Sequence, residues 1–205
     1  MNSLSFIGNQ SFPAFFPDDL TEWLGATAVL NLAREAAELF YWVEAESEEH
    51  ISFNGCRNPL RKLALLTYCY ATGIYGTCEI QSRSVTDQSL RNLCGGANFP
   101  GEKLRLFRGH NSELLKLCLA HVLRCAWCAR SDQSYRCSTV IDSSNHALLA
   151  GRLNAHFREF FASEADERLH RSIQADEFVA LAKSNSPVSG SGGGSSRLCL
   201  GSIAN

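Results

Sequence analysis

No stretch of this 205-residue sequence stays apolar for the ~20 residues that a membrane-spanning helix requires, because Arg, Lys or Gly interrupts each apolar run. Residues 1–16 also lack a basic segment followed by a sustained apolar segment, so we expect no secretion signal. Scattered cysteines such as Cys69, Cys118 and Cys125 then predict small buried side chains in a reducing compartment. We therefore expect a cytoplasmic protein without a membrane span.

Alternation of polar and apolar residues with a period of two is also nearly absent, and the best strand candidate, residues 138–141, is short. Apolar residues instead recur at spacings of three and four, and Pro59 and Gly95 are typical start and stop signals for helices. The sequence thus predicts an all-α, compact multi-helix domain. The expected helices cover residues 27–46, 59–73, 76–80, 87–94, 100–108, 112–125, 148–161 and 164–182. The expected core is Leu60, Leu63, Leu66, Tyr70, Ile74, Ile80, Leu90, Leu93, Leu104, Phe107, Leu114, Leu115, Cys118 and Val122.

Charge is distributed unevenly along the chain. Residues 1–56 carry nine acidic side chains and one basic one, whereas residues 57–136 carry twelve basic and five acidic ones. A basic segment beside an acidic segment indicates either an anionic partner or packing of the two segments on each other. We expect an acidic helical leader (1–56) on a basic helical core (57–136), then a helical extension (137–183) and a flexible Ser/Gly tail (184–205).

Several short motifs follow one another in residues 58–123. They are Tyr70-Ala71-Thr72-Gly73-Ile74, the pair Glu79-Ile80, Asp87 with Arg91, Leu93, Gly95 and Gly96, and the pair Phe107-Arg108. In this order they resemble the amino-terminal (InsH-type) domain of bacterial insertion-sequence transposases, and residues 16–24 resemble the opening of that domain. The resemblance spans roughly half of the chain. It implies a helical DNA-binding domain.

Two departures from that family bear on catalysis. Residues 98–104 differ from the loop that the family has before its Phe-Arg helix, and about 70 residues follow Cys137, too few for the family's RNase H-like catalytic domain. Asp142 loosely resembles the first of three catalytic carboxylates, but one carboxylate cannot hold two metal ions, and we interpret it as a helix cap. We expect no independent catalysis and no cofactor. An enzyme fragment that needs a second chain is a weaker possibility.

Basic side chains in the core are the candidates for DNA contacts, because affinity for a duplex comes largely from Lys and Arg replacing condensed counterions. Short helices joined by a glycine turn are consistent with a helix-turn-helix, whose second helix reaches base edges. We place this second helix at residues 102–110. The full candidate set is Arg57, Arg61, Lys62, Arg83, Arg91, Lys103, Arg105 and Arg108.

A cluster of soft ligands raises the question of zinc. His121, Cys125, Cys128 and Cys137 include a Cys-x2-Cys pair and could supply four ligands to a tetrahedral ion. Cys125 falls on the apolar stripe of a helical segment, however, and His121 lies four residues before it. We therefore interpret these cysteines as core residues and expect no bound metal.

The sequence supports two functional hypotheses. The first is a non-catalytic, nucleoid-associated protein that binds duplex DNA such as transposon ends, alone, as a homodimer or with a full-length transposase. The alternative is a protein-interaction or dimerisation module, a regulator or accessory subunit in which the acidic leader covers the basic core. The two differ in whether the basic surface is free or neutralised within the chain.

Overall fold

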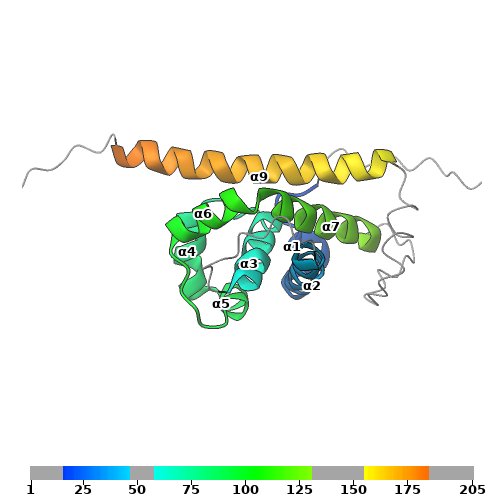
Figure 1. Cartoon of the computed structure of the whole chain (residues 1–205), viewed down its shortest axis with the longest axis horizontal. Coiled ribbons are helices and arrows are strands. Elements are labelled where there is room, and N and C mark those ends of the chain that lie inside the picture. Colours follow the sequence, from blue (N-terminus) through cyan, green and yellow to red (C-terminus); the bar gives the residue numbers. More distant parts are fainter. Residues whose placement is uncertain (1–15, 47–57, 131–154, 185–205) are drawn as a thin grey trace, which may run out of the picture.

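The computed structural model describes residues 16–46, 58–130 and 155–184, which form eight helices and no strand (Figure 1). The expected all-α fold is confirmed for these residues. The possible strand at 138–141 and the tail beyond Ser184 lie outside them. The helices are α1 (Thr21–Leu24), α2 (Ala26–Glu46), α3 (Pro59–Ala71), α4 (Thr77–Thr86), α5 (Gln88–Cys94), α6 (Gly101–His110), α7 (Ser112–Arg130) and α9 (Ala155–Ser184).

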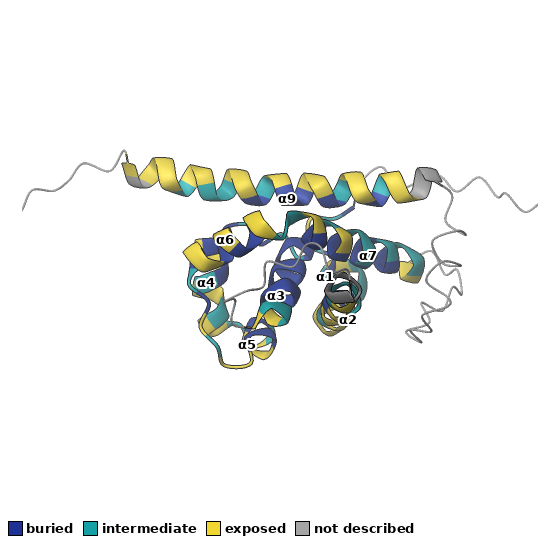
Figure 2. Cartoon of the chain, viewed as in Figure 1, coloured by how far each residue is buried: buried dark blue, intermediate teal, exposed yellow. Residues whose placement is uncertain are grey.

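Helix α3 is the centre of the structure. Its residues from Lys62 to Ala71 are all buried. A helix with apolar side chains on all sides is stable only when other elements surround it. It contacts α2, α5, α6, α7 and α9, and it is dark along most of its length in the burial view (Figure 2). The long helix α9 runs along one side of the other helices (Figure 1).

The expected core is confirmed closely. All of its members are buried except Leu60, which is half-buried and packs against the others. The prediction succeeded because the three-and-four spacing of apolar residues identifies the inward side of each helix from local sequence alone.

Local signals also set the ends of α5. The side chain of Asp87 caps it by accepting hydrogen bonds from the backbone N–H groups of Ser89 (2.7 Å) and Leu90 (3.2 Å). Gly95 ends it in the left-handed conformation, with φ of 56°. Asp87 is thus the N-cap of α5 and Gly95 its C-cap, the positions at which aspartate and glycine are typically found.

Three helices are longer than expected. Helix α4 continues past Ile80 to Thr86, α7 continues past Cys125 to Arg130, and α9 is one helix where two were expected. None of the added intervals contains Gly or Pro, so nothing in the local sequence interrupts the backbone hydrogen bonds.

The acidic leader packs on the core with its apolar side. Val29, Ala33 and Ala36 of α2 are fully buried, and α2 lies against α3 and α7. The carboxylates of Glu35 and Glu38 point outward and form no ion pair with any residue that the structure describes. The leader therefore covers the core without neutralising its basic side chains in this part of the chain.

Candidate nucleic-acid interface

Exposed cations lie on the three short helices α4, α5 and α6 and at the start of α3. Arg61, Arg83, Arg91, Lys103 and Arg105 are all exposed. Arg57, also in the expected set, lies outside the described residues. We call these five side chains the basic surface.

Arg61 lies across the end of α5. Its Nη1 donates a hydrogen bond to the carbonyl of Cys94 at 3.4 Å, which places a cation at the negative end of a helix. A Cβ on Gly95 would come within 2.6 Å of the same Nη1, so the position of Arg61 depends on a glycine there. Arg91, on the outer side of α5, donates to the side-chain oxygen of Gln88 at 2.7 Å.

Arg83 is the one member of the basic surface that forms an ion pair among the residues described. Its partner is Glu79, at 2.7 Å and one turn earlier on α4, and both side chains are about half exposed. Exposed pairs of this kind contribute only a few tenths of a kcal/mol, roughly 0.3–0.5. Arg83 can therefore exchange this carboxylate for a phosphate at little cost.

Helix α6 has a buried side and an exposed side. Gly101, Leu104, Phe107 and Arg108 face the core, and Lys103 and Arg105 lie at the two margins of the exposed side. A hydrogen bond joins the start of this helix to α4: the side-chain oxygen of Gln81 accepts from the backbone N–H of Gly101 at 2.7 Å.

Two residues of the expected DNA-binding set point inward, which corrects that prediction. Lys62 is 7% exposed, and its ammonium lies 5.7 Å and 5.6 Å from the ring centres of Phe99 and Phe107. Arg108 is 5% exposed and belongs to an ion pair inside the protein. Neither can reach a phosphate in this arrangement. The burial of Arg108 could have been predicted from its spacing, because it lies four residues after Leu104 and therefore on the same, buried side of α6.

Asp176 of α9 is the partner of Arg108, and no motif in the sequence indicated this pair. Its Oδ2 lies 2.9 Å from Arg108 Nη2. Its Oδ1 accepts hydrogen bonds from the backbone N–H of Thr77 (2.8 Å) and from the Thr77 hydroxyl (2.9 Å). Gly76 gives α4 no side-chain cap, so the carboxylate from α9 caps this helix instead. One side chain thus joins α4, α6 and α9.

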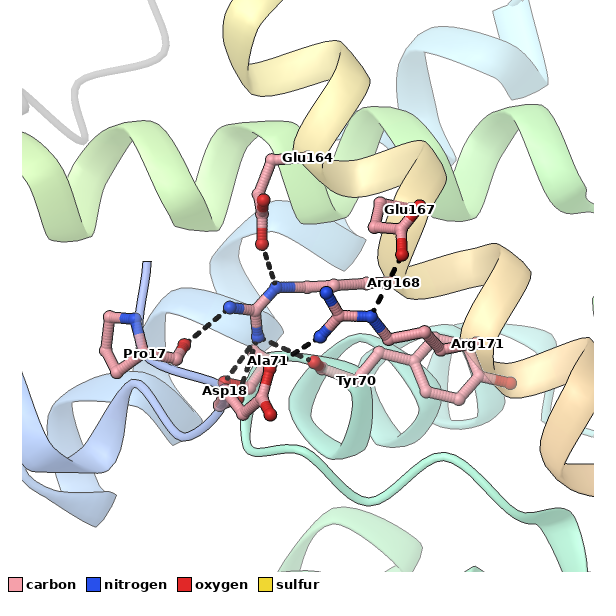
Figure 3. A network of polar contacts seen from close by, with 8 residues as sticks. All are labelled: Pro17, Asp18, Tyr70, Ala71, Glu164, Glu167, Arg168 and Arg171. Carbon is pink, nitrogen blue, oxygen red and sulfur yellow. Dashed lines mark hydrogen bonds and ion pairs between the residues drawn. The ribbon is translucent and has the colours of Figure 1, made fainter. Parts of the chain in front are cut away.

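Arg168 of α9 is a second buried cation that joins α9 to the other helices, and Figure 3 shows its contacts. Its side chain is fully buried. It donates hydrogen bonds to the carbonyls of Pro17 (2.6 Å), Asp18 (2.9 Å), Tyr70 (3.0 Å) and Ala71 (3.3 Å), and to the carboxylate of Glu164 (2.9 Å). The guanidinium therefore ties the leader to the carboxyl end of α3.

Four of the cysteines that the structure describes are buried, whereas Cys78 is exposed and Cys128 is half-buried. Burial raises the pKa of the Cys118 thiol, and it raises the pKa of Cys69 well above its ordinary value, so both are protonated at neutral pH. The Cys125 sulfur lies 3.5 Å from Nε2 of His121. No group of three His, Cys, Asp or Glu side chains among the described residues could hold a metal ion, and Cys137 lies outside them.

Comparison with known proteins gives no relative: no family model, no curated protein and no solved structure matches this chain. The resemblance of residues 58–123 to the transposase domain thus stays a prediction. Among the described helices, none is long and apolar enough to cross a membrane.

Proposed function

We propose that this protein binds duplex DNA through the basic surface. The observation that carries this proposal is the exposure of five cations, which residues 16–46 of the acidic leader do not neutralise. Four of them, Arg61, Arg91, Lys103 and Arg105, form no ion pair within the part of the chain that the structure describes. Lys and Arg side chains of this kind bind a duplex by displacing condensed counterions.

The charge balance of the region supports the same proposal. Residues 58–110 carry seven basic and three acidic side chains, and five of the seven basic ones are exposed. Two of the three acidic side chains, Glu79 and Glu102, are exposed as well, so the excess is positive but moderate. The region therefore offers more cations than carboxylates to a phosphate backbone.

Helix α6 is the element that we assign to the major groove. It follows α5 through residues 95–100, a connection longer than the usual three- or four-residue turn, so the unit is helix-turn-helix-like. Arg61, Arg83 and Arg91 contact phosphates in this proposal, while Lys103 and Arg105 lie nearest the bases. The resemblance of residues 58–123 adds transposon ends as the class of duplex and nucleoid association as the location, without catalysis by this chain.

The proposal predicts a salt-dependent affinity for duplex DNA, measured by the anisotropy of a labelled oligonucleotide. Arg61→Ala and Arg91→Ala should weaken binding to every sequence and lower the slope of log affinity against log salt by about one unit each. Arg105→Ala should cost about 1–3 kcal/mol and relax the preference at one or two base pairs.

Arg34→Ala is the matched control, because Arg34 is an exposed arginine on α2, a helix that carries no member of the basic surface. It should leave both affinity and slope unchanged. The proposal is wrong if the full chain binds no duplex at micromolar concentration and low salt, or if Arg34→Ala weakens binding as much as Arg61→Ala.

The carboxyl-terminal half of α9 favours a second function, self-association. Ile173, Phe178 and Leu181 are exposed, Phe178 to 74%. Phe178 and Leu181 are three residues apart and are therefore neighbours on the helix surface, and Ile173 lies about two turns before Leu181. Figure 2 shows this end of α9 mostly exposed. Exposed apolar side chains that lie together are typical of interaction surfaces, and a second copy of the chain or a full-length transposase are the partners we consider.

Light scattering on the full chain tests self-association. We expect a mass that rises toward that of a dimer with protein concentration and returns to the monomer value in Phe178→Glu, because a buried carboxylate opposes an apolar interface. A wild-type protein that stays monomeric over the same concentrations contradicts this second function.

A further inference from the structure

Gly109 on α6 has no structural reason to be a glycine. Gly25, Gly73, Gly95 and Gly96 have positive φ angles, and Gly101 packs against the backbone of Thr77. Gly109 shares neither property, since its φ is not positive and an added Cβ would meet nothing within 4 Å. A glycine inside a helix costs about 0.5–1 kcal/mol relative to alanine, so the fold alone favours alanine here.

The residues around Gly109 indicate what kind of partner binds this side of α6. Leu106 lies one turn earlier and is 53% exposed. Glu102, Arg105, Leu106 and Gly109 are separated by three, one and three residues, so they form one stripe along the exposed side of α6. The stripe thus combines an exposed apolar side chain, a position without a side chain, one cation and one carboxylate.

We propose that this stripe enters the major groove of DNA, that Gly109 lets the duplex approach the helix backbone closely, and that Leu106 contacts the methyl group of a thymine. The inference rests on the proposed function and adds the side chains that give it sequence preference. Glu102 argues for base edges over phosphates at this position, because a carboxylate repels phosphate but accepts a hydrogen bond from the amino group of cytosine.

The charges around the stripe favour DNA as the occupant over an apolar protein surface. Arg105 lies within the stripe and Lys103 lies at its margin, and neither has an ion-pair partner among the described residues. Arg105 can therefore donate to a base edge inside the groove, and Lys103 can reach the phosphates at its border.

Gly109→Ala separates this role from a structural one. On the full chain we expect the melting temperature to rise by about 2–5 °C, because alanine favours the helix, while affinity for DNA falls by about 5- to 100-fold. The DNA probe is a duplex enriched from a random-sequence pool by the wild-type protein. Ser163→Ala on the exposed side of α9 is the control, and it should leave DNA affinity unchanged.

Leu106 is tested by changing the DNA as well as the protein. Replacing thymine with uracil in the enriched duplex should weaken binding of the wild-type protein at one position and have no effect on Leu106→Ala. Leu117→Ala, which removes an exposed leucine from α7, is the control and should respond to uracil as the wild type does.

The outcomes distinguish this inference from the proposed function. If the wild-type protein binds no duplex, both are wrong. If it binds with the expected salt dependence but Gly109→Ala binds as tightly as the wild type, only the inference is overturned. Equal uracil sensitivity of the wild type and Leu106→Ala likewise overturns the thymine contact.

Discussion

Arg168→Met is expected to lower the free energy of unfolding by about 3–5 kcal/mol, measured by urea denaturation followed by circular dichroism. Methionine approximates the volume of the side chain but donates no hydrogen bond. The carbonyls of Pro17, Asp18 and Tyr70 would each lose the hydrogen bond from the guanidinium, Ala71 would keep the one from the backbone N–H of Leu20, and Glu164 would lose its counter-charge. An unsatisfied buried polar group costs about 1–3 kcal/mol, which explains why the effect is large.

Arg171→Met is the control for this prediction. Arg171 lies one turn further along α9 and pairs with Asp18 at 2.6 Å and Glu167 at 3.1 Å, but its side chain is 36% exposed. Water can replace its partners, so its loss should cost less than about 1 kcal/mol. Arg168→Lys should fall between the two, since an ammonium keeps the charge but cannot span the same set of carbonyls. Equal losses for the two methionine variants would contradict our interpretation of Arg168.

Asp176→Asn should lower the free energy of unfolding by about 3 kcal/mol, because it leaves the buried charge of Arg108 without a counter-charge. The Asn side chain can still accept a hydrogen bond from Thr77, so the capping role is largely kept. The double variant Arg108→Met/Asp176→Leu should lose much less than the sum of its single variants, since it removes both charges together.

The pair formed by Lys116 and Asp166 serves as the comparison. It also joins the core to α9, at 2.9 Å, but the Asp166 side chain is 64% exposed. Asp166→Asn should therefore cost less than about 1 kcal/mol. If the double variant of Arg108 and Asp176 shows additive losses, the two side chains do not act as a pair.

The helices and the core could be predicted because their signals are local. Asp87 and Gly95 mark the ends of α5 by side-chain and backbone chemistry within a few residues. The spacing of apolar residues similarly identifies the buried side of each helix. The exposed candidates Arg61, Arg91, Lys103 and Arg105 were predicted by residue type and are placed on the surface, although their binding to DNA is still a proposal.

The contacts of α9 could not be predicted in the same way. Asp176 follows Thr77 by 99 residues, and no pattern in the sequence links a surface-type carboxylate to a distant helix start. Arg168 likewise lies 150 residues from Asp18. Such pairs form only when the packing of apolar faces has fixed the relative positions of the helices, so residue type alone gives no signal for them.

The position of Asp176 near the end of the described chain has a consequence for biosynthesis. During translation the segment with α4 and α6 leaves the ribosome long before α9 is made, because domains are synthesised from the amino end. Until then the start of α4 lacks its cap and the guanidinium of Arg108 has no counter-charge, which disfavours its burial. Helix α6 of the nascent protein is thus held in place last, so the surface that we propose for DNA binding is complete only after α9 has been made.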